Sequence, residues 1–275
     1  VMHYGGHWVM IALAILTIFL IIRSNRRFRE KSAEESGDTL FQTILSTTDQ
    51  EQAWKLLVVY IAEQQQKFLR YAGECYAGAG RAFLTEDVRG LGKADSSLRR
   101  QKEVLKSSRR KETLCLRHVP RGIAIEKSAW FHLGNNCCMA MLYNLRRITE
   151  ICKEHVENNF LPLPVAHVAD FEAVCSRVSA LLEATASMTD GTWSEDVPAL
   201  RRRCDEVKEM VSDMYHKLYV QLREGDVSAI GVLYVYLNML QETREMVANI
   251  RKYLRAYAKL RDSDYSGREV AAGVL

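Results

Sequence analysis

The sequence has few of the residues that interrupt helices. Only four prolines occur among its 275 residues, Pro120, Pro162, Pro164 and Pro198. The stretches between them are rich in Leu, Ala, Glu, Lys, Arg and Gln, which favour α-helix, and strand-like alternation of polar and apolar residues is nearly absent. With 48% hydrophobic and 26% charged residues, the chain has enough apolar side chains for a folded core. We therefore predict an all-α protein.

Signatures of common catalytic sites are also missing. The sequence contains no phosphate-binding GxxxxGKS or GxxxxGKT loop, no GxGxxG, no GxSxG and no HExxH. We predict that the protein is not an enzyme, and we name no catalytic residue. A cluster of polar side chains converging in a cavity of the bundle would reopen that question.

The cysteines show neither a CxxC pair nor an even number that could form a complete disulfide framework. Most of them occupy apolar helical positions, so we expect reduced core thiols in a cytosolic domain. The seven are Cys75, Cys115, Cys137, Cys138, Cys152, Cys175 and Cys204.

One long apolar run stands near the start of the chain. Residues 8–22 read WVMIALAILTIFLII, and five basic residues with a single acid follow over 23–31. Such a run approaches the length that crosses a bilayer, and the basic cluster places the following residues in the cytoplasm. We predict a transmembrane helix and basic juxtamembrane segment over 1–30, in the inner (cytoplasmic) membrane, with residues after about 23 in the cytoplasm. A signal peptide fits less well, because its basic residues would come first.

Because the apolar run begins almost at Val1, we expect the chain to be the C-terminal part of a longer protein. After a linker over 31–48, apolar residues recur at three- and four-residue spacing and predict an up-and-down bundle of about six helices over 49–265, before a C-terminal tail over 266–275. The second helix has few apolar residues and should lie on the outside of the bundle. The expected helices cover approximately 49–83, 86–116, 125–157, 168–186, 198–218 and 230–254.

Basic residues are most concentrated between Lys93 and Arg121, where ten stand against three acids. With the juxtamembrane arginines they predict contacts to anions or lipid headgroups, although a solvated outer helix face explains them as well. Nucleic acid is excluded as a partner, because aromatic residues do not alternate with the basic ones. The predicted contact residues are Arg23, Arg26, Arg27, Arg99, Arg100, Arg109 and Arg110.

Acidic residues Asp205, Glu209 and Asp213 follow one another at four-residue spacing, so they share one face of a helix. Their oxygens could hold a divalent metal ion, the one cofactor we predict, or they could simply face solvent. Cys152 and His155 are also three residues apart on one predicted helix, but two ligands do not complete a tetrahedral metal site.

The stretch from Ala82 to Pro164 resembles a known family. Its segments AFLTEDVRGLGKADSSLRRQKEVLKSSRRKE and LRHVPRGIAIEKSAWFHLGNNCCMAMLYNLRRITEICKEHVENNFLPLP resemble the PhoU-like cytosolic C-terminal region of bacterial PiT-type inorganic phosphate transporters. In long forms of that family such a region follows the last membrane helix, and the resemblance extends over most of 8–260. PhoU proteins hold metal clusters with repeated acidic E/DxxxD motifs, which only the Asp205 to Asp213 stretch approaches here.

The resemblance implies a regulatory or assembly bundle of a cation-coupled phosphate transporter, without the permeation site. Its partners would be the membrane, the transporter's membrane domain in the same chain or complex, and a second copy in a homodimer. The alternative is a stand-alone membrane-anchored signalling or phosphate-regulatory protein, which would share the apolar run and the heptad-like helices.

Overall fold

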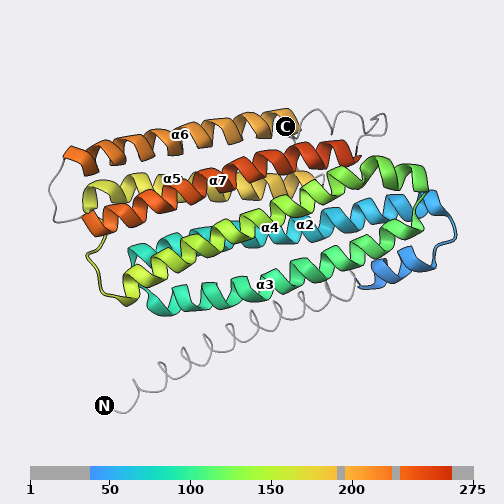
Figure 1. The fold of residues 1–275 in the computed structure, drawn as a ribbon, viewed down its shortest axis with the longest axis horizontal. Coiled ribbons are helices and arrows are strands. Elements are labelled where there is room, and N and C mark those ends of the chain that lie inside the picture. The colour runs from blue at the N-terminus through green and yellow to red at the C-terminus, as the bar shows by residue number, and fades with distance from the viewer. Residues whose placement is uncertain (1–37, 191–195, 225–229, 262–275) are drawn as a thin grey trace, which may run out of the picture.

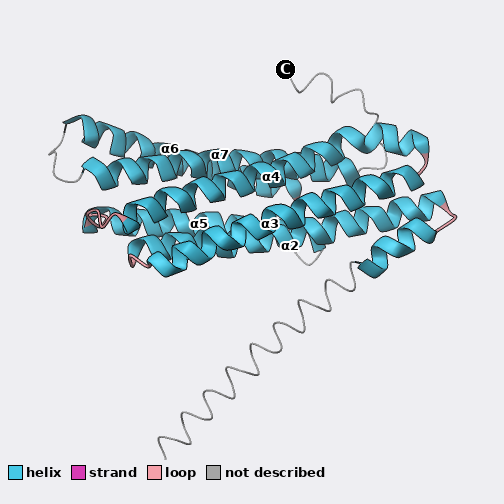
Figure 2. Ribbon diagram, turned by 60° about the horizontal axis from the view of Figure 1, so that its bottom comes forward, coloured by secondary structure: helices cyan, strands magenta, loops and turns pink. Residues whose placement is uncertain are grey.

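The computed structural model describes residues 38–190, 196–224 and 230–261, and it confirms the all-α prediction. These residues form long helices joined by short loops, with no strand among them (Figure 2). The elements are α2 (Gln50–Leu84), α3 (Val88–Cys115), the 3-10 helix η1 (Leu116–His118), α4 (Arg121–Glu157), α5 (Val165–Asp190), α6 (Val197–Glu224) and α7 (Ile230–Arg261).

The six long helices run side by side along one axis, with α6 at one edge and α3 near the other (Figure 1). α7 packs between α4 and α6, and α2 contacts α3, α4 and α5. As expected from its thin apolar seam, α3 lies on the outside: Leu91 and Leu98 are buried, and most of its other side chains are exposed or half-buried. This arrangement makes α7 the neighbour of α6 over an extended surface.

Side-chain caps and turn residues fix where the first two long helices meet. The Asp49 carboxylate accepts from the backbone N–H of Glu51 at 2.9 Å and begins α2. After Leu84, Glu86 adopts a positive φ of 52°, and Asp87 then accepts from the Gly90 N–H at 2.9 Å to begin α3. Aspartate is among the preferred N-cap residues, because its oxygen pairs one of the free N–H groups of the first turn.

Four helices are longer than the sequence predicts. α4 begins at Arg121 rather than near 125, because Pro120 serves as its N-cap and the helix continues through Gly122. α5 covers Val165–Asp190 instead of 168–186, α6 covers Val197–Glu224 instead of 198–218, and α7 continues to Arg261. Apolar periodicity identifies the buried face of a helix but does not fix its terminal turns.

The linker predicted over 31–48 is helical over residues 38–46. Phe41 and Ile44 are buried there and belong to a hydrophobic cluster with Leu57 of α2 and Trp130 of α4. The spacing of these two residues is that of an apolar helix face, but the segment is too short, and too rich in Ser and Thr, to be distinguished from a linker by pattern alone.

Two hydrophobic clusters form the core. The larger one includes apolar side chains from α2, α3, α4, α5, α6 and α7, while the smaller one joins residues 38–46 to α2, α4, α7 and the η1 region. Apolar residues at this three- and four-residue spacing, such as Leu57, Phe68, Met141 and Leu254, are fully buried. The apolar periodicity therefore identified the faces that pack.

The predicted membrane helix and the predicted tail lie outside the described residues. Across 38–190, 196–224 and 230–261, no helix is both long enough and apolar enough to cross a bilayer.

Candidate functional site: a cationic groove between two helices

The acidic stripe predicted as a metal site lies on the outer face of α6. Asp205, Glu209 and Asp213 are all exposed. The Asp205 Oδ1 lies 2.7 Å from the Arg251 Nε of α7, so this carboxylate is engaged in an ion pair. In the part of the chain that the structure describes, no three His, Cys, Asp or Glu side chains are grouped so that they could hold a metal. The geometry therefore gives no support to a metal site at Asp205, Glu209 and Asp213.

Cys152 and His155 have separate packing partners. The His155 Nε2 lies 2.9 Å from the backbone oxygen of Leu161, and its ring packs 5.6 Å from that of Phe83. The Cys152 Sγ lies 3.5 Å from the Met239 Sδ. These contacts give both side chains a structural role, because they pack the C-terminal part of α4 against neighbouring segments.

The basic residues predicted on α3 do not form a single site. The Arg99 guanidinium pairs with Asp95 of its own helix at 3.1 Å, while Arg100 and Arg110 are exposed. Arg109 and Arg110 border a surface hollow with Lys106, Thr113 and Leu114. Arg23, Arg26 and Arg27 lie outside the described residues. The α3 cations that are described thus occupy a solvated outer face.

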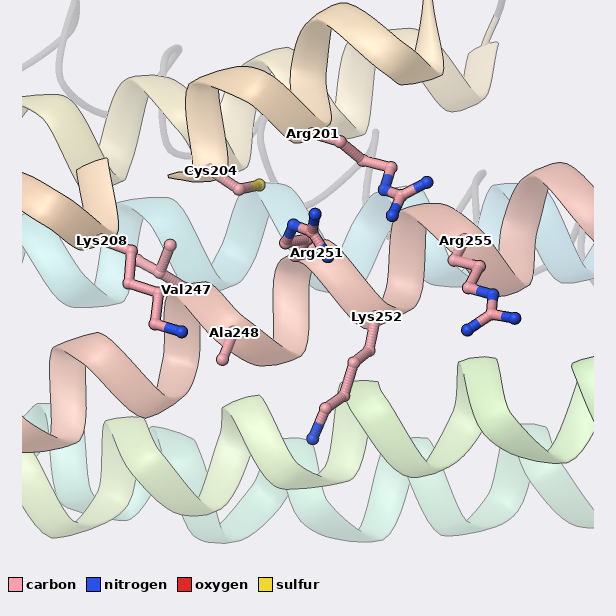
Figure 3. A pocket seen from close by; sticks show the side chains of 8 residues that line it. All are labelled: Arg201, Cys204, Lys208, Val247, Ala248, Arg251, Lys252 and Arg255. Atoms are coloured by element: carbon pink, nitrogen blue, oxygen red, sulfur yellow. The ribbon is translucent and has the colours of Figure 1, made fainter. Parts of the chain in front are cut away.

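A different cationic site lies between α6 and α7, where a groove of about 200 Å³ opens over the α7 helix (Figure 3). Five of its eight lining residues are basic, with Cys204, Val247 and Ala248 forming the remainder. Two of these cations belong to α6 and three to α7; in Figure 3 the α6 side chains extend toward α7, whereas Lys252 extends from α7 toward α4. The five are Arg201, Lys208, Arg251, Lys252 and Arg255.

The groove keeps most of its positive charge. Asp205 pairs with Arg251, and the Arg255 guanidinium lies 5.5 Å from the centre of the Trp130 ring of α4. The Arg201 Nε is buried and has no hydrogen-bond partner among the described residues. A desolvated guanidinium nitrogen of this kind is costly unless it gains an acceptor.

The thiol in the groove is not set up as a nucleophile. Burial and, to a smaller extent, the neighbouring Asp205 carboxylate raise the pKa of Cys204 to about 12, although nearby arginines oppose the shift. Because the thiolate is the reactive form, Cys204 is almost entirely protonated and unreactive near neutral pH. The groove offers positive charge and donors, which suit anion binding rather than covalent chemistry.

A second unpredicted feature is a buried chain of hydrogen bonds across four helices. Tyr253 of α7 donates to the Gln65 side chain of α2 at 3.1 Å, and Gln65 donates to Asn135 of α4 at 3.3 Å. Asn135 in turn donates to the Glu112 Oε2 of α3 at 2.8 Å. Burial raises the pKa of Glu112 to about 7, although the Asn135 hydrogen bond and Arg109 lower it in part.

Sequence reasoning missed the groove because its cations are divided between two helices. In α6, acids such as Glu206 alternate with the basic residues and leave no strong bias toward one charge, whereas α7 has an excess of basic residues and no acid between Glu245 and Arg261. The available signal was that Arg201 and Lys208 are seven residues apart and Arg251 and Arg255 are four apart, spacings that put each pair on one helix face. Only the pairing of α6 with α7 brings the two faces together.

Comparison with models of known protein families gave no match, and comparison with characterised protein sequences found no significant similarity. The likeness to the cytosolic region of phosphate transporters therefore depends on the residues quoted above.

Proposed function

We propose that this chain is the cytosolic regulatory and assembly bundle of a cation-coupled phosphate transporter, attached to the membrane through residues 1–30. The apolar run followed by arginines, the helical bundle after it and the likeness of residues 82–164 to the PhoU-like region all support this function. The observation that carries it furthest is the α6–α7 groove, because a protein that regulates anion transport needs a surface that recognises an anion.

In this mechanism the bundle carries out no covalent chemistry. It has two packings of its helices, and an anion or a docked partner that contacts one of them better shifts the population toward it. The basic segment over 23–31 connects the bundle to the membrane helix, so a change of packing would alter the position of that helix. Coupling of this kind needs only a few kcal/mol of difference between the two packings.

Removal of the bundle tests the proposal directly. A stop codon after residue 31 in the natural gene should change the rate of phosphate uptake, or its response to external phosphate, in cells whose other phosphate transporters are deleted. Uptake of radiolabelled phosphate measures both properties. An epitope tag on the membrane part controls for the amount of protein, and a truncated form that is equally abundant and regulated like the intact form would contradict the proposal.

A further inference from the structure

We propose that the groove between α6 and α7 is a binding site for a single phosphate group, and that binding there fastens α6 to the rest of the bundle. The inference deepens the proposed function and rests on it for the role of the site, since it names the ligand that the bundle would sense. The argument for the site itself comes from charge, chemistry and size.

Charge selects an anion. Five cations surround the groove, and Asp205 is the carboxylate paired with one of them. Residues 130–145 of α4, which include the Trp130 that Arg255 contacts, contain no Asp or Glu. In a site partly shielded from water, like charges repel one another more strongly than in bulk solvent, and a bound anion relieves that repulsion.

The donor chemistry favours phosphate. Guanidinium groups present planar pairs of N–H donors that match the oxygens of phosphate, and the lysine ammonium groups add strong point charges. The Arg201 Nε is buried and lacks a hydrogen-bond partner within the described chain, so an oxyanion would supply the acceptor that the protein does not. A doubly charged anion gains more than a singly charged one from this number of cations.

The size of the groove suits a small ligand. The groove measures about 200 Å³, which is below the roughly 300–1,000 Å³ typical of pockets for drug-sized molecules. It therefore has room for a single phosphate group. Three of the eight lining residues, Val247, Ala248 and Cys204, are apolar.

The site has a mechanical consequence because its cations come from both helices. Arg201 and Lys208 belong to α6, whereas the other three belong to α7, which packs against α4. A phosphate held by both sets would join α6, at the edge of the bundle, to its centre (Figure 1). Ligand binding that requires the packed form stabilises that form by mass action.

The test uses the full chain in nanodiscs of phosphatidylcholine, which carries no net charge. Inorganic phosphate titrated at constant ionic strength should raise Tm in a saturable way, by about 3 °C or more, and isothermal titration calorimetry gives the affinity. The double variant R201Q/K208Q removes both α6 cations and should bind phosphate at least about tenfold more weakly. The matched control R202Q/K217Q removes two exposed α6 cations outside the groove lining and should bind like the wild type.

A second set of nanodiscs identifies the source of the phosphate group. If inorganic phosphate stabilises the chain and the effect requires Arg201 and Lys208, the ligand is a free anion. If only nanodiscs containing phosphatidic acid stabilise it, again through these two residues, the ligand is a lipid headgroup. Absence of both effects, or equal effects in the two double variants, would overturn the site.

This result is separable from the proposed function. Phosphate binding in the groove together with unchanged uptake by the truncated transporter would support the binding site and contradict its role in transport. Altered uptake after truncation, without phosphate binding in the groove, would contradict the binding site and leave the proposed function supported.

Discussion

Glu112 shows how a single buried acid can make stability depend on pH. Its side chain is 1% exposed, and its hydrogen bond from Asn135 ends the polar chain that begins at Tyr253. Desolvation penalises the carboxylate form, so the folded protein holds this proton to a pH of about 7, compared with 4.5 for an unperturbed glutamate. The folded state thus binds the proton more tightly than the unfolded state does.

From this difference we predict that the contribution of Glu112 to stability is lost as pH rises from about 4.5 to about 7, because the unfolded state releases the proton first. E112Q keeps an acceptor for Asn135 and removes the charge. It should therefore be more stable than the wild type at pH 8, by up to about 3 kcal/mol, and equally stable near pH 4. Urea denaturation at a series of pH values measures the difference.

Glu103 supplies the control for this experiment. It belongs to the same helix, is exposed, and has its pKa lowered by a hydrogen bond from Lys106. E103Q should not show the rise in relative stability with pH that E112Q shows. If E112Q instead destabilises the protein equally at all pH values, its role is packing and the folded protein does not hold the proton.

At the scale of elements, two glycines of α2 distinguish the effect of helix propensity on stability from the effect of helix packing. A Cβ added to Gly80 would lie 2.6 Å from the Cys175 Sγ of α5 and close to Phe171, whereas a Cβ at Gly78 would meet nothing within 4 Å. G80A should therefore destabilise the protein by about 1–3 kcal/mol through overpacking. G78A should stabilise it by about 0.5–1 kcal/mol, because alanine is the better helix former.

Thermal or urea unfolding of the two variants checks this pair. Far-UV circular dichroism should show unchanged helix content in both. A stabilising G80A would mean that Cys175 moves aside at little cost, and that the close approach of α2 to α5 does not depend on the absence of a side chain.

Element by element, the sequence predicts helices well and contacts between helices poorly. Long apolar stripes and the prolines defined six helices, because these signals are local. The 38–46 helix was missed because its burial depends on a distant cluster around Leu57 and Trp130. The cationic groove and the Glu112 chain were missed for the same reason, since each combines side chains from helices that only tertiary packing makes neighbours.

At the scale of the whole molecule, the two hydrophobic clusters share their principal helices. α2, α4 and α7 contribute side chains to both clusters, and each of these helices is more than 30 residues long. Opening the smaller cluster would require fraying helices whose remaining length is packed in the larger one. We therefore expect both ends of the bundle to unfold in one cooperative transition.

Buried thiols in each cluster report on this cooperativity. Cys115 lies in the smaller cluster and Cys138 in the larger one, and burial raises the pKa of both, to about 11 for Cys115. Alkylation needs the exposed thiolate, so neither should react until the protein opens. Mass spectrometry of peptides labelled with iodoacetamide at increasing urea concentrations should give the same midpoint for both cysteines. Labelling of Cys115 at a distinctly lower urea concentration would show that the end containing residues 38–46 opens on its own, and the bundle would then have two units that an effector could shift separately.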